Sequence, residues 1–517
     1  MKRRTFVSGV LLMATGTAAA ACSAGEGVDI DGGTGGTDGG ADGGAGAVLR
    51  VAIGGEPDQL DPSKTSAYFS FQVLENVFDT LVAPDENLEM QPALAESWET
   101  SEDQLTWTFH LREDVTWHDG TELTAGDVVY TYNRIVEEEL SNAWKFGSVT
   151  GIDAPDDLTV VITVGAPTPS LLSSLGGFKG LAIVQEANVT SGEIGTKPIG
   201  TGPFSLTEYA SGDHITLAAN PDYWGGAPAL GGIEYQFISE PSTALAALRS
   251  GEIDWTDVVP PQQVAELQED DSLAVGVTPS SDYWYLALNQ KRDAWSDVRV
   301  RQAIAYAIDR EAIVQAVSYG TAAANQLAIP EDSFWYTEYS TYSTDLDTAT
   351  SLLAEAGFTG GTLDMLATSD YPETVTAAQI IASNLEAIGI TVEIRQPDFS
   401  TWLDEQNSGN FDMLMMGWLG NIDPDDFYYA QHHSEGGSNA QGYANPEVDE
   451  MLDAARVELD QDARKDLYAQ AATTIADECS YIYLYNPSVI QTWSPDLGGY
   501  EARADRAIRF ATATLAG

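Results

Sequence analysis

Lysine is nearly absent from this chain of 517 residues. It occurs only at positions 2, 64, 145, 179, 197, 291 and 465. The sequence has 79 acidic and 23 basic residues, which gives a formal net charge of −56 at pH 7. Such a surface repels nucleic acid and anionic lipid, so we expect neither as a partner. It also repels itself at low ionic strength, and high salt screens that repulsion. We therefore expect a salt-loving source organism.

Cysteine is just as scarce, with one residue at position 22 and one at position 479. Cys479 lies in an apolar stretch and is expected to be a small core residue. If Cys22 carries a lipid, Cys479 has no partner and the chain has no disulfide framework.

The first 22 residues have the pattern of an export signal. Lys2, Arg3 and Arg4 precede an apolar run at 6–21 that is too short and too rich in small residues for a membrane span. The double arginine resembles the twin-arginine signal. The sequence AAAC at 19–22 resembles a lipoprotein cleavage box, although Ala19 stands where leucine is usual. We expect Cys22 to bear the lipid; the alternative is ordinary cleavage after an alanine, with Cys22 incidental.

Residues 23–47 are mostly Gly, Asp, Thr and Ala, a composition that cannot form a core. We expect a flexible tether between the lipid and a globular body outside the membrane. The body has enough residues for two or three domains.

Motifs for common catalytic sites are also missing. The chain has no Gly-x-Ser-x-Gly elbow, no His-Glu-x-x-His pair and no phosphate-binding loop. His432 and His433 are adjacent, so on a helix they diverge rather than chelate one ion. Asp423 and Asp425 have the chemistry to act as acid and base on a sugar. We expect no enzymatic activity, no cofactor and no metal site.

The body shows alternating strand and helix patterns. Between 363 and 417, strands at 363–367, 390–395 and 411–417 and a helix at 377–388 predict an α/β domain. Thr124 and Asp127 mark the start of a helix at 124–136. Longer apolar periodicity predicts helices at 71–81 and 298–317, and the run YWYLALN at 283–289 predicts a buried strand.

Several segments, in order along the chain, resemble the family 5 extracellular solute-binding proteins of ABC transporters. They are 72–81 (QVLENVFDTL), 92–98 (PALAESW), 105–134 (LTWTFHLREDVTWHDGTELTAGDVVYTYNR), 200–204 (GTGPF), 220–224 (NPDYW), 301–310 (RQAIAYAIDR) and 417–429 (GWLGNIDPDDFYY). That family includes dipeptide-, oligopeptide-, nickel- and some oligosaccharide-binding lipoproteins.

The resemblance implies a two-lobed α/β fold like that of type II periplasmic binding proteins, with an extra inserted subdomain and a ligand cleft between the lobes. Lobe I would comprise 48–82, 201–285 and 488–517, with the subdomain 83–200 inserted in it. Lobe II would comprise 286–487. The chain would cross between lobes near 285–289 and 485–488, and closure of the lobes would trap the solute.

The loop 417–429 is the best candidate for ligand contact. In dipeptide and oligopeptide members, an Asp after the Trp-x-x element accepts the peptide ammonium, and here that place falls at Asn421. Asp423 is a candidate to replace it. Dipeptide binders also place an Arg after the strand equivalent to 363–367, whereas 368–372 (TSDYP) has no base. This argues against a strict dipeptide binder.

The residues expected to contact a solute combine acidic and amide groups with aromatic rings. They are Trp418, Asn421, Asp423, Asp425, Tyr371, Asp370, Tyr68 and Trp284, with Trp335 as a further aromatic near the cleft. We expect an oligopeptide-like solute, with an oligosaccharide as the alternative and a secreted hydrolase as an alternative of another class. The expected partners are a membrane permease and, through Cys22, the outer side of the cytoplasmic membrane; the protein is expected to be a monomer.

Overall fold

The computed structural model describes residues 46–419 and 422–516, which belong to one compact unit. The expected signal at 1–22 with Cys22, nearly all of the expected tether, and Asn421 lie outside the described residues. Within the described part, none of the helices combines the length and the apolarity needed to cross a membrane.

A seven-stranded sheet gathers strands from three separate stretches of the chain. Its order is β12-β19-β11-β1-β10-β9-β8. β1 runs parallel to β10 and β11, and the remaining pairs are antiparallel. The strands are β1 (Val48–Ile53), β8 (Phe204–Ala210), β9 (His214–Ala219), β10 (Gly232–Phe237), β11 (Trp255–Thr256), β12 (Ala274–Pro279) and β19 (Ser488–Trp493).

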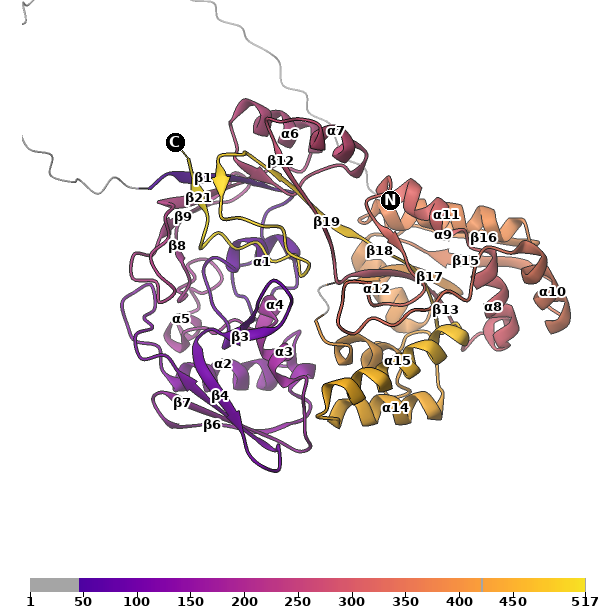
Figure 1. The fold of residues 1–517 in the computed structure, drawn as a ribbon, viewed down its shortest axis with the longest axis horizontal. Helices are drawn as coiled ribbons and strands as arrows, with labels where there is room; N and C mark the ends of the chain where they lie inside the picture. Colours follow the sequence, from indigo (N-terminus) through magenta and orange to yellow (C-terminus); the bar gives the residue numbers. More distant parts are fainter. Residues whose placement is uncertain (1–45, 420–421, 517) are drawn as a thin grey trace, which may run out of the picture. The chain divides into compact units, whose positions relative to one another are not determined.

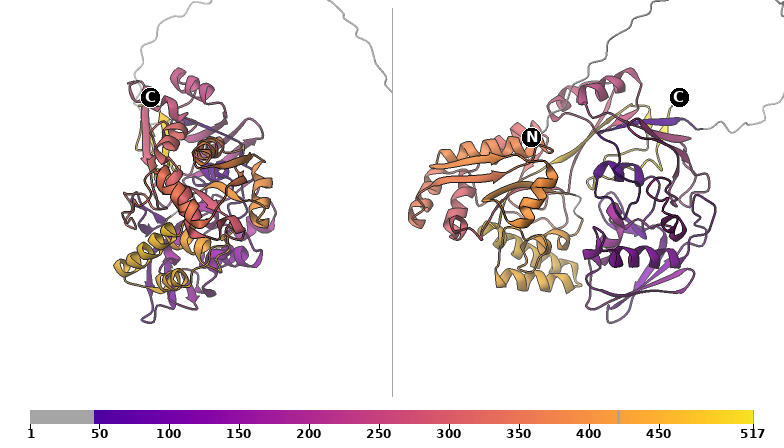
Figure 2. Two further views of the ribbon diagram at one scale, coloured as in Figure 1. Left: turned by 90° about the vertical axis from the view of Figure 1, so that its right-hand side faces the viewer. Right: turned by 180° about the vertical axis from the view of Figure 1, so that it is seen from behind.

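A four-stranded antiparallel sheet, β4-β5-β7-β6, lies between these stretches in sequence. Its strands are β4 (Ala95–Thr100), β5 (Thr106–Leu111), β6 (Val149–Asp156) and β7 (Thr159–Val164). Helix α2 (Ala125–Glu137) packs on this sheet through a shared apolar core (Figure 2). The helix start predicted at Thr124 is confirmed, because Asp127 Oδ2 accepts a hydrogen bond from the Thr124 N–H at 3.0 Å.

A six-stranded sheet, β14-β18-β13-β17-β15-β16, organises the other lobe. β15 is parallel to β16 and β17, which confirms the predicted α/β alternation. Helices α9 (Arg310–Ser318) and α11 (Pro372–Glu386) run along one side of it (Figure 1). The strands are β13 (Tyr283–Leu288), β14 (Ala323–Ala324), β15 (Gly361–Leu366), β16 (Ile390–Arg395), β17 (Met413–Trp418) and β18 (Tyr481–Asn486).

Two chain segments join the seven- and six-stranded sheets, and they are hydrogen-bonded to each other. One leads from β12 into β13, and the other leads from β18 through Pro487 into β19. Asn486 Nδ2 donates to the Asp282 carbonyl at 2.8 Å, and the Ser280 N–H donates to the Pro487 carbonyl at 3.0 Å. A lobe boundary between 285 and 286 would cut β13, which pairs with β17 from Tyr283 onward.

Two predicted helices differ from the structure. The helix predicted at 71–81 is α1 (Tyr68–Leu74), which ends early because the next residues bond elsewhere. Asn76 Oδ1 accepts from the Phe510 N–H at 2.9 Å, and the Asn76 carbonyl accepts from the Phe204 N–H at 3.0 Å. The helix predicted at 298–317 is two helices, α8 (Val298–Ala307) and α9. Asp309 breaks the run because its carboxylate caps α9, accepting from the Ala312 N–H at 3.0 Å.

Candidate functional site

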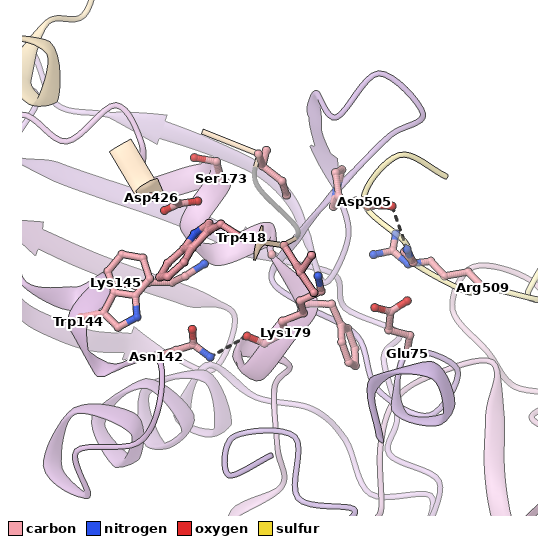
Figure 3. A pocket seen from close by; sticks show the side chains of 16 residues that line it. Glu75, Asn142, Trp144, Lys145, Ser173, Lys179, Trp418, Asp426, Asp505 and Arg509 are labelled. Atoms are coloured by element: carbon pink, nitrogen blue, oxygen red, sulfur yellow. Dashed lines mark hydrogen bonds between the residues drawn. The ribbon is translucent and has the colours of Figure 1, made fainter. Parts of the chain in front are cut away.

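A cavity of about 170 Å³ is lined by residues from both lobes (Figure 3). Lobe II contributes the end of β17 and the loop that follows it, including Trp418 and Asp426. The opposite wall comes from the residue after α1, from the short helices η1 (Ala143–Phe146), α3 (Leu171–Gly176) and α4 (Phe178–Leu181), and from the C-terminal segment 505–509.

Trp418 is half-buried and is the one residue of the expected ligand set that the cavity lining includes, within the described residues. It closes β17 directly after Gly417. A Cβ on Gly417 would lie 2.9 Å from the Trp284 ring, so this strand end has room for glycine only. Trp284 is itself buried, stacks on Tyr485 and packs against this end of β17.

Asp423 and Asp425 face other parts of lobe II. Asp423 is buried and accepts two hydrogen bonds from Arg464, at 2.7 and 2.6 Å. Asp425 pairs with Arg456 at 3.1 Å, and burial raises the pKa of its carboxyl to about 6. These pairs tie the loop to α14 (Pro446–Val457) and α15 (Gln461–Asp477). This arrangement favours a structural role for both acids, and their contact with a solute stays a prediction.

Tyr371 and Asp370 lie at the start of α11. The Tyr371 ring meets Trp284 edge-on, with centroids 6.4 Å apart, and also meets Phe399. Asp370 is exposed, and its Oδ2 accepts from the Phe399 N–H at 2.8 Å. Both residues therefore order the strand–helix turn beside Trp284.

Tyr68 is the first residue of α1 and lies within electrostatic reach of Arg506. Burial and the neighbouring Asp257 carboxylate raise the pKa of the Tyr68 hydroxyl. Arg506 lowers it, and its guanidinium pairs with Asp282 at 2.5 Å. Arg506 has a positive φ of 60°, a strained conformation for a residue with a side chain.

Trp335 packs against Tyr468 and beneath the Arg464 guanidinium, 5.1 Å from its ring centroid. It therefore belongs to the group that holds Asp423. That Trp335 also lies near the cleft stays a prediction.

The cavity also contains charged residues that the sequence did not single out. They are Glu75, Lys145, Lys179, Asp426, Asp505 and Arg509. Glu75 is buried, and desolvation raises the pKa of its carboxyl to about 7, against the opposing effect of Arg509. The scarcity of lysine is the sequence feature that could have pointed to these residues, because two of the seven lysines line this one cavity.

His432 is buried and both ring nitrogens are engaged, with Ser480 Oγ at 2.8 Å and Tyr483 Oη at 2.9 Å. Burial lowers the pKa of this ring to about 3. No group of three His, Cys, Asp or Glu side chains suited to a metal ion occurs in the part of the chain that the structure describes.

Comparison with known proteins agrees with this architecture. The family model "Bacterial extracellular solute-binding proteins, family 5 Middle" matches residues 89–439. The dipeptide-binding protein of Escherichia coli is 28% identical over 449 residues, covering 80% of this chain and 84% of its own length. The periplasmic oligopeptide-binding protein OppA of Salmonella typhimurium is 28% identical over 495 residues, covering 87% and 89%.

Among solved structures, the ABC transporter-associated periplasmic binding protein DppA from Helicobacter pylori, in complex with the peptide STSA, superposes with a TM-score of 0.81. It is 28% identical, and the match covers 91% of this chain and 98% of that one. With a family model matching well over half of its length, the chain belongs to the bacterial extracellular solute-binding proteins of family 5.

Proposed function

We propose that this protein is the substrate-binding component of an ABC importer, and that it captures an oligopeptide-like solute and delivers it to a membrane permease. The observation that carries the proposal is the cavity between the lobes, whose lining supplies Trp418 and charged groups of both signs. A peptide is itself amphipathic and carries both charges. The relatives described above are named for dipeptides and oligopeptides, and the DppA structure holds a peptide.

Capture rests on closure of the lobes. The two crossing segments are the covalent links between the large sheets, so bending there moves one wall of the cavity against the other. Arg506 lies at this junction, paired with Asp282 just before β13. A solute that contacts both walls stabilises the closed state, and its affinity depends on how readily that state forms.

Within the loop, Asp426 is the described carboxylate that lines the cavity, and it is the best-placed acceptor for a peptide ammonium. Asn421 remains a proposed contact on sequence grounds alone. If position 421 faces the ligand, Asn421→Asp strengthens peptide binding, because a charged acceptor replaces a neutral amide.

We further propose that the protein is anchored through a lipid on Cys22, works as a monomer and carries out no chemical turnover. Cys22→Ala should move the protein from the membrane fraction to the soluble fraction of lysed cells. Cys479→Ala is the matched control, because Cys479 is a buried core residue. Equal membrane retention of both variants would contradict lipid attachment at Cys22.

Titration of the tryptophan fluorescence with tetrapeptides tests the function. We expect saturable binding and intact peptides after long incubation. Cleaved peptides would instead reveal a hydrolase, and binding of oligosaccharides without binding of peptides would contradict peptide capture.

A further inference from the structure

The cavity concentrates positive charge in a chain that has very little. Lys145, Lys179 and Arg509 all line it, although the sequence has only 23 basic residues among 517. They come from three separate segments, η1, α4 and the C-terminal stretch, so their convergence is a product of the fold.

Arg509 differs from every other arginine that the structure describes. Each of the others makes at least one side-chain hydrogen bond. Within residues 46–419 and 422–516, the Arg509 guanidinium and the Lys179 ammonium make no hydrogen bond or ion pair. A partly buried guanidinium that presents five donors without an acceptor is poised for an anion.

On the wall that carries Lys179 and Arg509, the acids Asp505 and Glu75 do not cancel this charge. The Asp505 carboxylate is held by Arg503, at 3.0 and 2.9 Å. Glu75 lies between Lys179 and Arg509 (Figure 3), and its carboxyl accepts the Ile508 N–H at 2.9 Å. Because burial raises the pKa of Glu75 to about 7, this carboxyl is only partly ionised at neutral pH. Lys179 is left under-compensated, and burial lowers the pKa of its ammonium despite the acids nearby.

We propose that Lys179 and Arg509 form a carboxylate-binding subsite of the cleft, so that the preferred solute presents a free carboxylate at the Glu75 end. This inference rests on the proposed function and names the solute chemistry that this site selects. The subsite supplies, from lobe I, a basic group for the ligand carboxylate. The segment 368–372 of lobe II has no such group. Two basic side chains donate to one carboxylate in a site that closure shields from water. A peptide that presents a neutral group there binds much more weakly than one that presents a carboxylate.

The test is selection from a mixed tetrapeptide library prepared twice, once with free C-termini and once as C-terminal amides. The intact protein is mixed with each library, and the retained peptides are identified by mass spectrometry. We expect free acids to be retained at least about tenfold better than amides. If the amides retained are enriched in Asp or Glu, the carboxylate that the subsite reads is a side chain; if they are not, it is the C-terminus.

Variants then locate the subsite. Lys179→Gln and Arg509→Gln should each lower the ratio of retained free acids to retained amides from at least about tenfold to about one. Lys179→Arg should retain the preference. Lys197→Gln is the matched control, because this exposed lysine lies outside the cavity lining and its loss changes the net charge equally.

Equal retention of acids and amides by the unmodified protein, with no enrichment of Asp or Glu among the retained amides, would overturn the inference while leaving peptide capture intact. Retention of no peptide from either library would overturn the proposed function and the inference together. The comparison of libraries needs no variant, so a variant that fails to fold does not weaken it.

Discussion

At the scale of single residues, Glu75 shows how burial and charge act together. Its carboxyl has an ordinary pKa of 4.5, which burial raises to about 7. Between pH 4.5 and about pH 7, the Glu75 carboxyl keeps its proton in the folded protein but has released it in the unfolded chain. The stability that this group contributes is therefore present below about pH 4.5 and is lost as the pH rises to about 7.

This predicts the behaviour of Glu75→Gln. The amide keeps an acceptor for the Ile508 N–H and cannot ionise. At pH 8 the variant should be more stable than the parent by up to roughly 3 kcal/mol, and at pH 4 the difference should vanish. Urea unfolding at both pH values measures it. Glu186→Gln, at an exposed helix start, is the control; a pH-independent difference for Glu75→Gln would contradict the shift.

Asp426 gives the second prediction at this scale. If its carboxylate accepts the ligand ammonium, Asp426→Asn should weaken binding of peptides with a free N-terminus by about tenfold or more. Binding of N-acetylated peptides should be unchanged, because they present no ammonium. Calorimetric titration with both peptide forms measures the effect. Equal losses for the two forms would show that Asp426 acts on the shape of the loop instead.

The cavity residues show what the sequence could and could not reveal. Trp418 was predicted because it lies in a recognisable loop. Lys179 and Arg509 were not, because they lie 330 positions apart in sequence and meet only through the packing of α4 and the C-terminal segment. Asp423 was predicted to face the solute, but the pattern of the loop gave no hint of Arg464, 41 residues further on.

At the scale of secondary-structure elements, local patterns predicted strands and helix starts well and helix ends less well. The β15–α11–β16 unit follows from its apolar periodicity. The apolar pattern of 298–317 continues across two helices, because both bury the same kind of face against the core of lobe II. The first helix ends at Ala307, where Ile308 turns extended, and Asp309 caps the second helix. A capping residue inside a periodic apolar run is easily taken for part of one helix.

Replacing Asp309 tests this account of the break. Asp309→Ala removes the acceptor for the Ala312 N–H and should lower the free energy of unfolding by about 1 kcal/mol. Asp309→Asn retains a capping oxygen and should have a much smaller effect. Denaturant unfolding compares the three proteins. An equal loss for Ala and Asn would mean that the charge matters rather than the cap.

At the scale of the whole molecule, the net charge of −56 dominates solution behaviour. Mutual repulsion of surface carboxylates destabilises the compact state, and added salt screens it. The melting temperature should therefore rise by several degrees from dilute buffer to molar NaCl. The melting temperature in molar sucrose at the same low ionic strength is the control, because it distinguishes charge screening by salt from general effects of a concentrated solute. Greatest stability in salt-free buffer would contradict a salt-adapted surface.

The cleft between the lobes is proposed to capture a peptide with a free carboxylate. Mass spectrometry of the solute that remains bound through native purification tests it most directly. We expect short peptides with unblocked C-termini or acidic side chains, released on denaturation and depleted in a preparation of Arg509→Gln. Recovery of glycans, or of peptides that lack any free carboxylate, would contradict it.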